Sequence, residues 1–304
     1  MANSSDWISA LRLRTLPLSI SGILVGSFLA VFQGYWNPVI FSLALSTTLL
    51  FQILSNLAND LGDSLKGADN QERVGPMRAV QSGAISKSAM KNAVILTSLL
   101  SFFSAGLLIY FGTKNLSPSS VYIYIGLAVA SVFAAITYTI GKKAYGYNGL
   151  GDLFVFIFFG LVSVMGVYPL FSDRLSWILI FPAVTIGFLS TSVLNLNNMR
   201  DRENDEKVGK RTLVVKLGAS NAKKSHFFLV ISAFVSWGIF LILTENWLGF
   251  ISFIPGILFI KHLVFVSKNT LPKELDSQLK IVALGTFFVS LLYVISVSIN
   301  QWVL

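Results

Sequence analysis

Long apolar segments separated by polar ones dominate the sequence of this chain of 304 residues. Each segment is long enough to cross a hydrocarbon core of about 30 Å as an α-helix. No linker or low-complexity tract divides the chain, so the pattern predicts an all-α integral membrane protein. We expect nine transmembrane helices in one bundle, forming a single domain over residues 1–304. The segments run from Leu16 to Phe32, Val39 to Leu57, Ala93 to Phe111, Tyr122 to Ile140, Leu153 to Phe171, Trp177 to Leu196, Phe227 to Leu243, Trp247 to Val266 and Ile281 to Ile299.

Composition supports this interpretation and excludes a soluble globular protein. The chain is 54% hydrophobic and 12% charged, whereas soluble domains carry about 25% charged residues. It has no cysteine, which excludes disulfides, thiolate metal sites and cysteine nucleophiles. Its two histidines, His226 and His262, are too few for a histidine-based metal cage.

Basic residues gather on one side of the predicted bundle. The N-terminus, the loops after the even-numbered spans and the adjoining part of the eighth span hold 21 of the 23 lysine and arginine residues, and only Lys114 and Arg174 lie opposite. Because such residues accumulate in cytoplasmic loops, the N-terminus is predicted to be cytoplasmic and the C-terminus external. The first span is not predicted to be a cleaved signal, since charged residues precede it and no cleavage site follows. The absence of an organelle-targeting segment suits a bacterial inner membrane.

The net charge of +9 follows from this orientation. No basic soluble domain stands apart from the spans, so nucleic acid is not an expected partner. Membrane lipid is the expected environment, and the sequence indicates no obligate protein partner.

Two acidic, asparagine-rich patches follow directly on the second and sixth apolar segments. Their windows hold eight of the 14 acidic residues in the chain. Both patches lie on the side predicted to be cytoplasmic, where we expect them to face each other across a cavity. The first contains Asn56, Asn59, Asp60, Asp63, Asp69 and Glu72, and the second contains Asn197, Asn198, Asp201, Glu203, Asp205 and Glu206.

Helical spacing would align these side chains. Asn56, Asp60 and Asp63 fall at positions i, i+4 and i+7, and the second patch repeats such a stripe from Asn198 to Asp205. Ionised carboxylates near a membrane are costly unless a cation compensates them. Oxygen ligands without histidine or cysteine favour Mg²⁺ or Ca²⁺, and Mg²⁺ typically binds through one or two carboxylates together with substrate phosphates. Solvated helix ends are the alternative for one patch, but a matched pair favours metal binding.

Cations near the patches indicate what the metal would hold. A diphosphate suits both arginine forks and lysine point charges, although positive-inside bias alone also explains these residues. A diphosphate at the rim of a membrane cavity points to a polyprenyl diphosphate, whose lipid tail would enter laterally. Breaking its allylic C–O bond requires charge neutralisation and a dry, aromatic-lined site. The cations are Arg73, Arg78, Lys143, Lys210 and Arg211.

Several motifs together resemble the UbiA-type family of membrane aromatic prenyltransferases, and most closely its 1,4-dihydroxy-2-naphthoate branch. The chain departs from that branch at Leu13, Ile140, Lys142 and Ala144, where the pattern has proline, glycine, proline and proline. The matching motifs are Arg14-Thr15-Leu16-Pro17, Asn59-Asp60-Leu61-Gly62-Asp63, Lys66-Gly67-Ala68-Asp69, Gly75-Pro76-Met77-Arg78, Tyr138-Thr139, Lys143-Ala144-Tyr145-Gly146-Tyr147, Gly149-Leu150-Gly151-Asp152, Asn197-Asn198-Met199-Arg200-Asp201 and Gly209-Lys210-Arg211-Thr212-Leu213.

The resemblance implies a nine-helix bundle and a reaction. A polyprenyl group would pass from its diphosphate to 1,4-dihydroxy-2-naphthoate, with loss of diphosphate and CO2, giving demethylmenaquinone. It implies Mg²⁺ ligation by Asn59, Asp60, Asp63, Asp201 and Asp205, assisted by Asn198. It implies catalytic roles for Asp69, Tyr138 and Lys143, and substrate contacts by Asn56, Arg73, Arg78, Tyr145, Lys210 and Arg211.

Two alternatives remain open from the sequence. One is a UbiA-type enzyme with another acceptor, such as 4-hydroxybenzoate, homogentisate, haem or a glycerophosphate. The other is an ion or organic-anion transporter, because acids within membranes also mark ion paths. Transport sites usually lie near the membrane midplane on broken helices, whereas these acids cluster at the predicted cytoplasmic ends of spans, which favours an enzyme.

Overall fold

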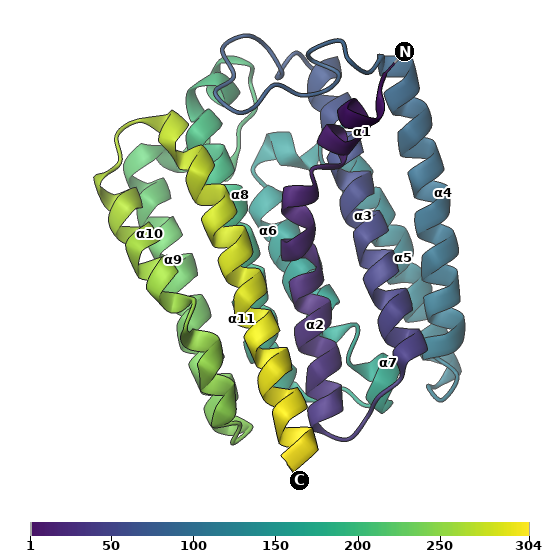
Figure 1. Cartoon of the computed structure of the whole chain (residues 1–304). Helices are drawn as coiled ribbons and strands as arrows, with labels where there is room; N and C mark the ends of the chain where they lie inside the picture. Colours follow the sequence, from purple (N-terminus) through teal and green to yellow (C-terminus); the bar gives the residue numbers. More distant parts are fainter. Residues whose placement is uncertain (1, 304) are drawn as a thin grey trace.

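The protein is an α-helical bundle (Figure 1), seen in a computed structural model that describes residues 2–303 and the side chains of residues 2–301. Within those residues, nine helical segments are long and apolar enough to cross a membrane, which confirms the predicted architecture. The helices are α1 (Ser4–Leu11), α2 (Leu16–Phe32), α3 (Pro38–Leu65), α4 (Lys87–Gly112), α5 (Pro118–Thr137), α6 (Gly151–Val155), α7 (Pro169–Ser172), α8 (Ile180–Lys207), α9 (Leu213–Leu243), α10 (Gly256–Lys268) and α11 (Leu275–Val303).

Shorter helical stretches complete several spans. The π-helical stretch η3 (Phe156–Met165) lies between α6 and α7 and forms the middle of the fifth span. The remaining stretches are 3₁₀-helical: η1 (Leu13–Thr15), η2 (Tyr145–Asn148), η4 (Trp177–Leu179), η5 (Leu248–Phe253) and η6 (Pro272–Glu274).

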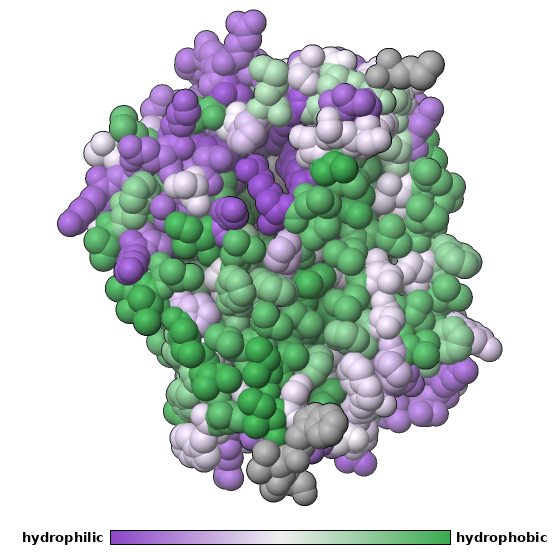
Figure 2. All heavy atoms as spheres, viewed as in Figure 1, coloured by the Kyte–Doolittle hydropathy of each residue, from purple (hydrophilic) through white to green (hydrophobic). Residues whose placement is uncertain are grey.

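The surface has the polarity expected of a membrane protein. Figure 2 shows a broad hydrophobic band around the middle of the bundle, with hydrophilic residues gathered at its two ends. Burying such a band in lipid removes apolar surface from water, which is favourable. The chain termini lie at opposite ends (Figure 1). We call the end that carries α1 and the loop of residues 66–86 the N-terminal face.

The helices extend further into the polar segments than the apolar pattern predicts. α3 continues to Leu65 and α8 to Lys207, so the acids of the second patch and the first patch as far as Asp63 lie on the final turns of helices, whereas Asp69 and Glu72 lie in the loop after α3. The segment between the sixth and seventh apolar windows is largely helical, because α8 continues to Lys207 and α9 begins at Leu213. Thr212 caps it by accepting a hydrogen bond from the amide of Val215 at 3.3 Å. Hydropathy locates the apolar window of a helix, and polar turns and caps extend beyond that window.

Close helix packing holds the bundle together around a buried aromatic core. Trp237 and Phe240 on α9 pack against Tyr293 on α11, and all three are buried. Gly160 on η3 approaches α8 so closely that a Cβ atom there would lie 2.5 Å from the carbonyl oxygen of Ala183. Glycine is therefore required at position 160 by space, as in other membrane helix contacts formed by small residues.

This contact predicts a position-specific loss of stability. Gly160→Val should destabilise the bundle by about 1–3 kcal/mol or more, because η3 and α8 would have to separate. Gly126→Val is the matched control, since no atom lies within 4 Å of a Cβ at Gly126. Thermal unfolding in detergent checks the pair, and equal losses for both variants would contradict the packing argument.

Candidate active site

A cavity of about 360 Å³ extends into the bundle from the N-terminal face. Figure 2 shows a recess with hydrophilic residues around it at that face. Polar side chains from α3 and α8 line one part of the cavity, and apolar side chains line the part within the membrane span. The apolar wall includes Leu108, Phe154, Phe158, Phe159 and Val167. The cavity is thus suited to a molecule with a charged head and a lipid-like body.

The first acidic patch is built around Asp63 on α3. The guanidinium of Arg78 donates to Asp63 Oδ2 at 2.5 Å and to Asp69 Oδ2 at 3.1 Å. The hydroxyl of Tyr147 donates to Asp63 Oδ1 at 2.7 Å. Arg78 also donates to the carbonyl of Asn59 at 3.1 Å, so the loop of residues 66–86 folds back onto the end of α3.

The second patch is built around Asp201 on α8. Arg200 donates to both of its carboxylate oxygens, at 3.1 and 2.7 Å, and the amide of Gly75 donates to it at 3.1 Å. Arg200 also bonds to Asp276, at the start of α11. Asp201 is therefore fixed by its own helix, by α11 and by the loop of residues 66–86.

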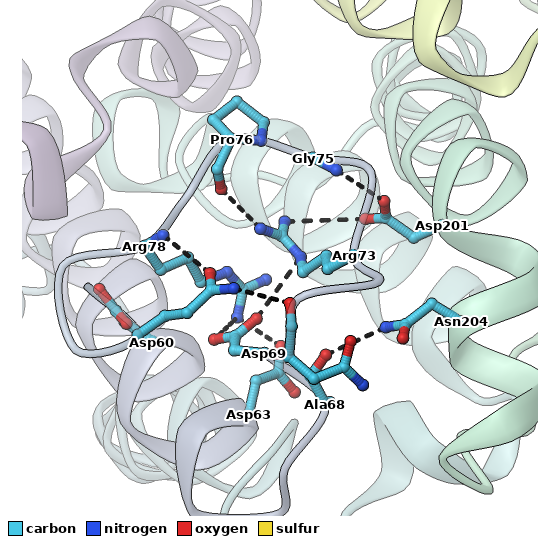
Figure 3. Close-up of polar contacts among 12 residues, drawn as sticks. Asp60, Asp63, Ala68, Asp69, Arg73, Gly75, Pro76, Arg78, Asp201 and Asn204 are labelled. Atoms are coloured by element: carbon cyan, nitrogen blue, oxygen red, sulfur yellow. Dashed lines mark hydrogen bonds and ion pairs between the residues drawn. The ribbon is translucent and has the colours of Figure 1, made fainter. Parts of the chain in front are cut away.

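The two patches lie next to each other, as the sequence predicted. Lys210 Nζ lies 3.6 Å from Asp205 and 3.9 Å from Asp63, so one ammonium group contacts both patches. Arg73 forms a second link, at 3.4 Å from Asp69 and 3.7 Å from Asp201 (Figure 3). Carboxylates from two spans that are far apart in sequence thus share their cations.

Comparison with known proteins identifies the family. A family model described as the UbiA prenyltransferase family matches residues 19–292. The chain belongs to the UbiA prenyltransferase family. It is 39% identical, over 99% of its length and 98% of the relative's, to the 1,4-dihydroxy-2-naphthoate octaprenyltransferase of Escherichia coli (strain K12). It is 40% identical to the enzyme of that name from Haemophilus influenzae, over 94% of each chain.

Solved structures share the UbiA fold with this chain. A UbiA homolog from Aeropyrum pernix K1, solved in its apo form, superposes with a TM-score of 0.67 over 92% of this chain and 99% of that one, at 16% identity. A structure described as a digeranylgeranylglyceryl phosphate synthase gives a TM-score of 0.59 over 96% of this chain and 98% of that one, at 18% identity. At these identities the likeness concerns the fold.

UbiA prenyltransferases are metal-dependent, and the buried oxygen atoms of this site fit such an ion. Within the described part of the chain, Asn198 Oδ1 and Asp205 Oδ2 are buried without a hydrogen-bond partner. Leaving such atoms unpaired is unfavourable, and a cation would satisfy them. Between residues 2 and 303, no three carboxylate or imidazole groups converge into a complete cage. The donor set therefore suits an ion that takes its other ligands from water or substrate phosphate.

Several residues predicted from the sequence line the cavity of this UbiA-family protein. Tyr145 stacks on Phe154 with ring centroids 4.0 Å apart and meets Tyr138 edge-on at 5.3 Å. These rings form an aromatic wall close to the acidic patches. The predicted residues on the cavity lining are Asn56, Asn59, Asp63, Arg78, Tyr138, Tyr145 and Lys210.

Other predicted residues lie outside this lining. Asp60 accepts a hydrogen bond from the amide of Val80 at 3.3 Å, and its ligation of a metal stays a prediction. Asp69 and Arg73 belong to the ion-pair network above the cavity. Lys143 and Arg211 are exposed residues of the N-terminal face, and substrate contact by either also stays a prediction.

Asn56 has an internal partner. Its amide nitrogen donates to the carbonyl of Leu11 at 2.9 Å and to Thr15 Oγ1 at 3.1 Å. A substrate contact by this nitrogen would compete with these two bonds. In the structure, Asn56 positions the junction between α1 and α2, and its substrate contact stays a prediction.

Sequence reasoning missed three residues that organise the site. Tyr147 bonds Asp63, and Lys66 Nζ lies 4.1 Å above its ring. Arg200 and Asp276 together fix Asp201. Tyr147 and Arg200 both lie within motifs identified in the sequence. For Arg200, the available signal was an arginine at the end of an apolar span. Asp276 carried no local signal because its partners are distant in sequence.

Burial and charge shift the pKa values of groups around the rim. Burial raises the pKa of Asp69, although the guanidinium of Arg78 opposes that shift. Burial alone would lower the pKa of Arg78, but Asp63 and Asp69 outweigh it and raise that pKa. Burial and the charge of Asp63 both raise the pKa of Tyr147. Arg78 and Tyr147 therefore keep their protons and remain donors to Asp63.

The buried contacts between Arg200 and Asp201 predict a large loss of stability when this ion pair is broken. Arg200→Met leaves Asp201 buried with less compensation, which should cost about 3–5 kcal/mol in the free energy of unfolding. Arg202 is the matched control on the same helix, because its partners Glu203 and Glu206 are exposed. Arg202→Met should cost less than about 1 kcal/mol. Unfolding in detergent, followed by circular dichroism, compares them, and a loss below 1 kcal/mol for Arg200→Met would contradict this role.

Proposed function

We propose that this chain transfers a polyprenyl group from a polyprenyl diphosphate to 1,4-dihydroxy-2-naphthoate, giving demethylmenaquinol, the reduced form of demethylmenaquinone, for menaquinone synthesis. The observation that carries the proposal is the pair of buried acidic patches joined by Lys210 at the mouth of an apolar cavity. The near full-length relatives named 1,4-dihydroxy-2-naphthoate octaprenyltransferase support the choice of acceptor.

The metal in this proposal is Mg²⁺. Its ligands would come from Asn59, Asp60 and Asp63 on α3 and from Asn198, Asp201 and Asp205 on α8. Oxygen donors and a substrate diphosphate are the ligands that this ion prefers. When bound, Mg²⁺ would neutralise the negative charge that develops on the leaving diphosphate.

The residues of the chain then bind the two ends of the prenyl donor. Arg78 and Lys210, whose charged groups face Asp63 at the rim, would hold the diphosphate oxygens. The apolar wall around Phe158 and Phe159 would take the prenyl chain and exclude water from the allylic carbon. The faces of Phe154 and Tyr145 would stabilise the allylic cation.

Bond changes in the reaction balance without an external oxidant or reductant. The allylic C–O bond breaks and its electron pair leaves with diphosphate. The acceptor ring carbon that bears the carboxylate then forms the new C–C bond, and loss of CO2 returns an electron pair to the ring. No ring proton has to be removed, so a base is needed at most for a hydroxyl group. Asp69, Tyr138 and Lys143 are the proposed groups for that transfer and for orienting the acceptor.

We place this reaction at the cytoplasmic side of a bacterial inner membrane. The N-terminal face carries the loops that hold most of the lysine and arginine residues of the chain. A transporter is less well supported, because the acids lie on the last turns of α3 and α8 rather than on helices broken near the midplane.

Removing one carboxylate from each patch tests the metal site. Asp63→Asn and Asp205→Asn should each lower turnover by more than about 100-fold, as loss of a main stabiliser of transition-state charge does. Glu203→Gln is the matched control, since Glu203 is an exposed residue on the same helix as Asp205. EDTA should abolish turnover and Mg²⁺ should restore it. Full activity of both aspartate variants would remove the paired-site mechanism.

The acceptor is tested by direct competition. Purified protein with Mg²⁺ and a polyprenyl diphosphate should release CO2 from carboxyl-labelled 1,4-dihydroxy-2-naphthoate in step with product formation. Preference for 4-hydroxybenzoate, or prenylation of the naphthoate without CO2 release, would contradict the proposed reaction. Metal-dependent ion flux without product would favour the transporter.

A further inference from the structure

One arginine of the cavity lining forms no ion pair among the described residues. The described lining residues include a single acid, Asp63, and that acid is engaged by Arg78 and Lys210. Arg12 also lines the cavity, yet it makes no ion pair within residues 2–303. Its Nη2 atom is buried and has no hydrogen-bond partner among these residues. A buried guanidinium nitrogen without an acceptor is unfavourable, so this position is suited to an anionic ligand.

The backbone at Arg12 gives a second indication. Arg12 ends α1 in the left-handed conformation, with φ 50° and ψ 58°. Glycine and asparagine are the residues that favour this position at a helix end, and other side chains are strained there. The backbone therefore does not account for an arginine at position 12. Strained residues of this kind are held by their surroundings and gather at ligand sites.

Hydrogen bonds from α3 hold the segment that carries Arg12. Asn56 binds the carbonyl of Leu11 and the hydroxyl of Thr15, and Gln52 Nε2 donates to the same hydroxyl at 3.3 Å. Gln52 Nε2 also donates to Asn56 Oδ1 at 3.1 Å. These bonds hold the chain on both sides of Arg12 before any ligand arrives, and preorganisation of this kind reduces the entropy lost on binding.

Gln52 adds an acceptor to this wall of the cavity. Its Oε1 atom is buried and has no donor partner among the described residues. The wall thus offers a positively charged donor from Arg12 and a neutral acceptor from Gln52. An ionised diphosphate could pair with Arg12, but it has no proton to donate to Gln52. A hydroxyl group next to a carboxylate on an aromatic ring satisfies both residues.

We propose that Arg12 and Gln52 bind the ortho-hydroxycarboxylate edge of the aromatic acceptor, at a site separate from the diphosphate. The inference rests on the proposed function, whose acceptor carries a hydroxyl beside its carboxylate. Arg12 donates to the carboxylate, and Gln52 Oε1 accepts from the hydroxyl. The two residues thereby set specificity for acceptors that carry both groups, and Asn56 acts as a positioning residue for Arg12.

Binding measurements on the full chain in detergent test this assignment. Arg12→Asn removes the guanidinium while keeping a residue that tolerates the left-handed conformation. It should weaken binding of 1,4-dihydroxy-2-naphthoate by about 10- to 100-fold, the range for a lost charge-assisted hydrogen bond. Binding of 1,4-naphthalenediol, which lacks the carboxylate, and of geranylgeranyl diphosphate should stay within about twofold. Arg202→Asn is the control and should change none of the three.

A second variant separates the hydroxyl contact from the carboxylate contact. Gln52→Met keeps the volume of the side chain and should weaken both naphthols by about 5- to 10-fold, because both retain the hydroxyl. Isothermal titration calorimetry without oxygen gives the dissociation constants, and the KM values for acceptor and donor give an independent readout.

Three outcomes would overturn the inference. Weaker binding of the prenyl diphosphate with intact acceptor binding would assign Arg12 to the diphosphate. Equal losses for the naphthoate and the naphthalenediol in Arg12→Asn would show that the carboxylate is not recognised there. Unchanged binding of all three probes in both variants would remove the site.

Failure of the proposed function is distinguishable from these outcomes. If the wild-type protein prenylates 4-hydroxybenzoate in preference to the naphthoate, the proposed acceptor is wrong. Arg12 is then tested with 4-hydroxybenzoate and phenol as the matched pair. A selective loss of 4-hydroxybenzoate binding in Arg12→Asn would support carboxylate binding by Arg12, and equal losses would contradict it.

Discussion

The compensation of buried carboxylates by shared cations is the interaction on which the rest of this structure depends. Asp63 and Asp205 lie on helices far apart in sequence, and Lys210 contacts both. Isolated buried charges are strongly unfavourable, so each carboxylate requires a partner. The loop of residues 66–86 is held over the cavity because Arg73 and Arg78 supply partners from it. The same charges, with an ion added, would accept a diphosphate.

The fold serves this arrangement by extending two helices beyond the apolar band. α3 and α8 place their last polar turns at the N-terminal face, where the cavity begins. Close packing of η3 on α8 at Gly160 and the aromatic contacts between α9 and α11 hold the α8 side of the bundle together. The position of the helices in the membrane therefore suits a ligand whose anionic head lies at the rim and whose apolar body lies along η3.

The sequence predicted the parts of this structure that depend on local pattern. Apolar segments predicted the nine spans, and helical spacing aligned the acidic side chains within each patch. Contacts between distant segments were not predictable, as Asp276 and the tie from Asn56 to Leu11 show. The left-handed backbone of Arg12 had no local signal either, because glycine or asparagine usually marks that conformation. Metal ligation and the substrate contacts of Lys143 and Arg211 remain predictions.

Locating the ions tests the central claim most directly. A crystal structure with Mn²⁺ in place of Mg²⁺ and an unreactive prenyl thiolodiphosphate would show them by anomalous scattering. The account predicts ions between α3 and α8, bridged by the diphosphate and ligated from both acidic patches, with the prenyl chain along η3. Ions bound by one patch alone, or a diphosphate held away from both, would contradict it.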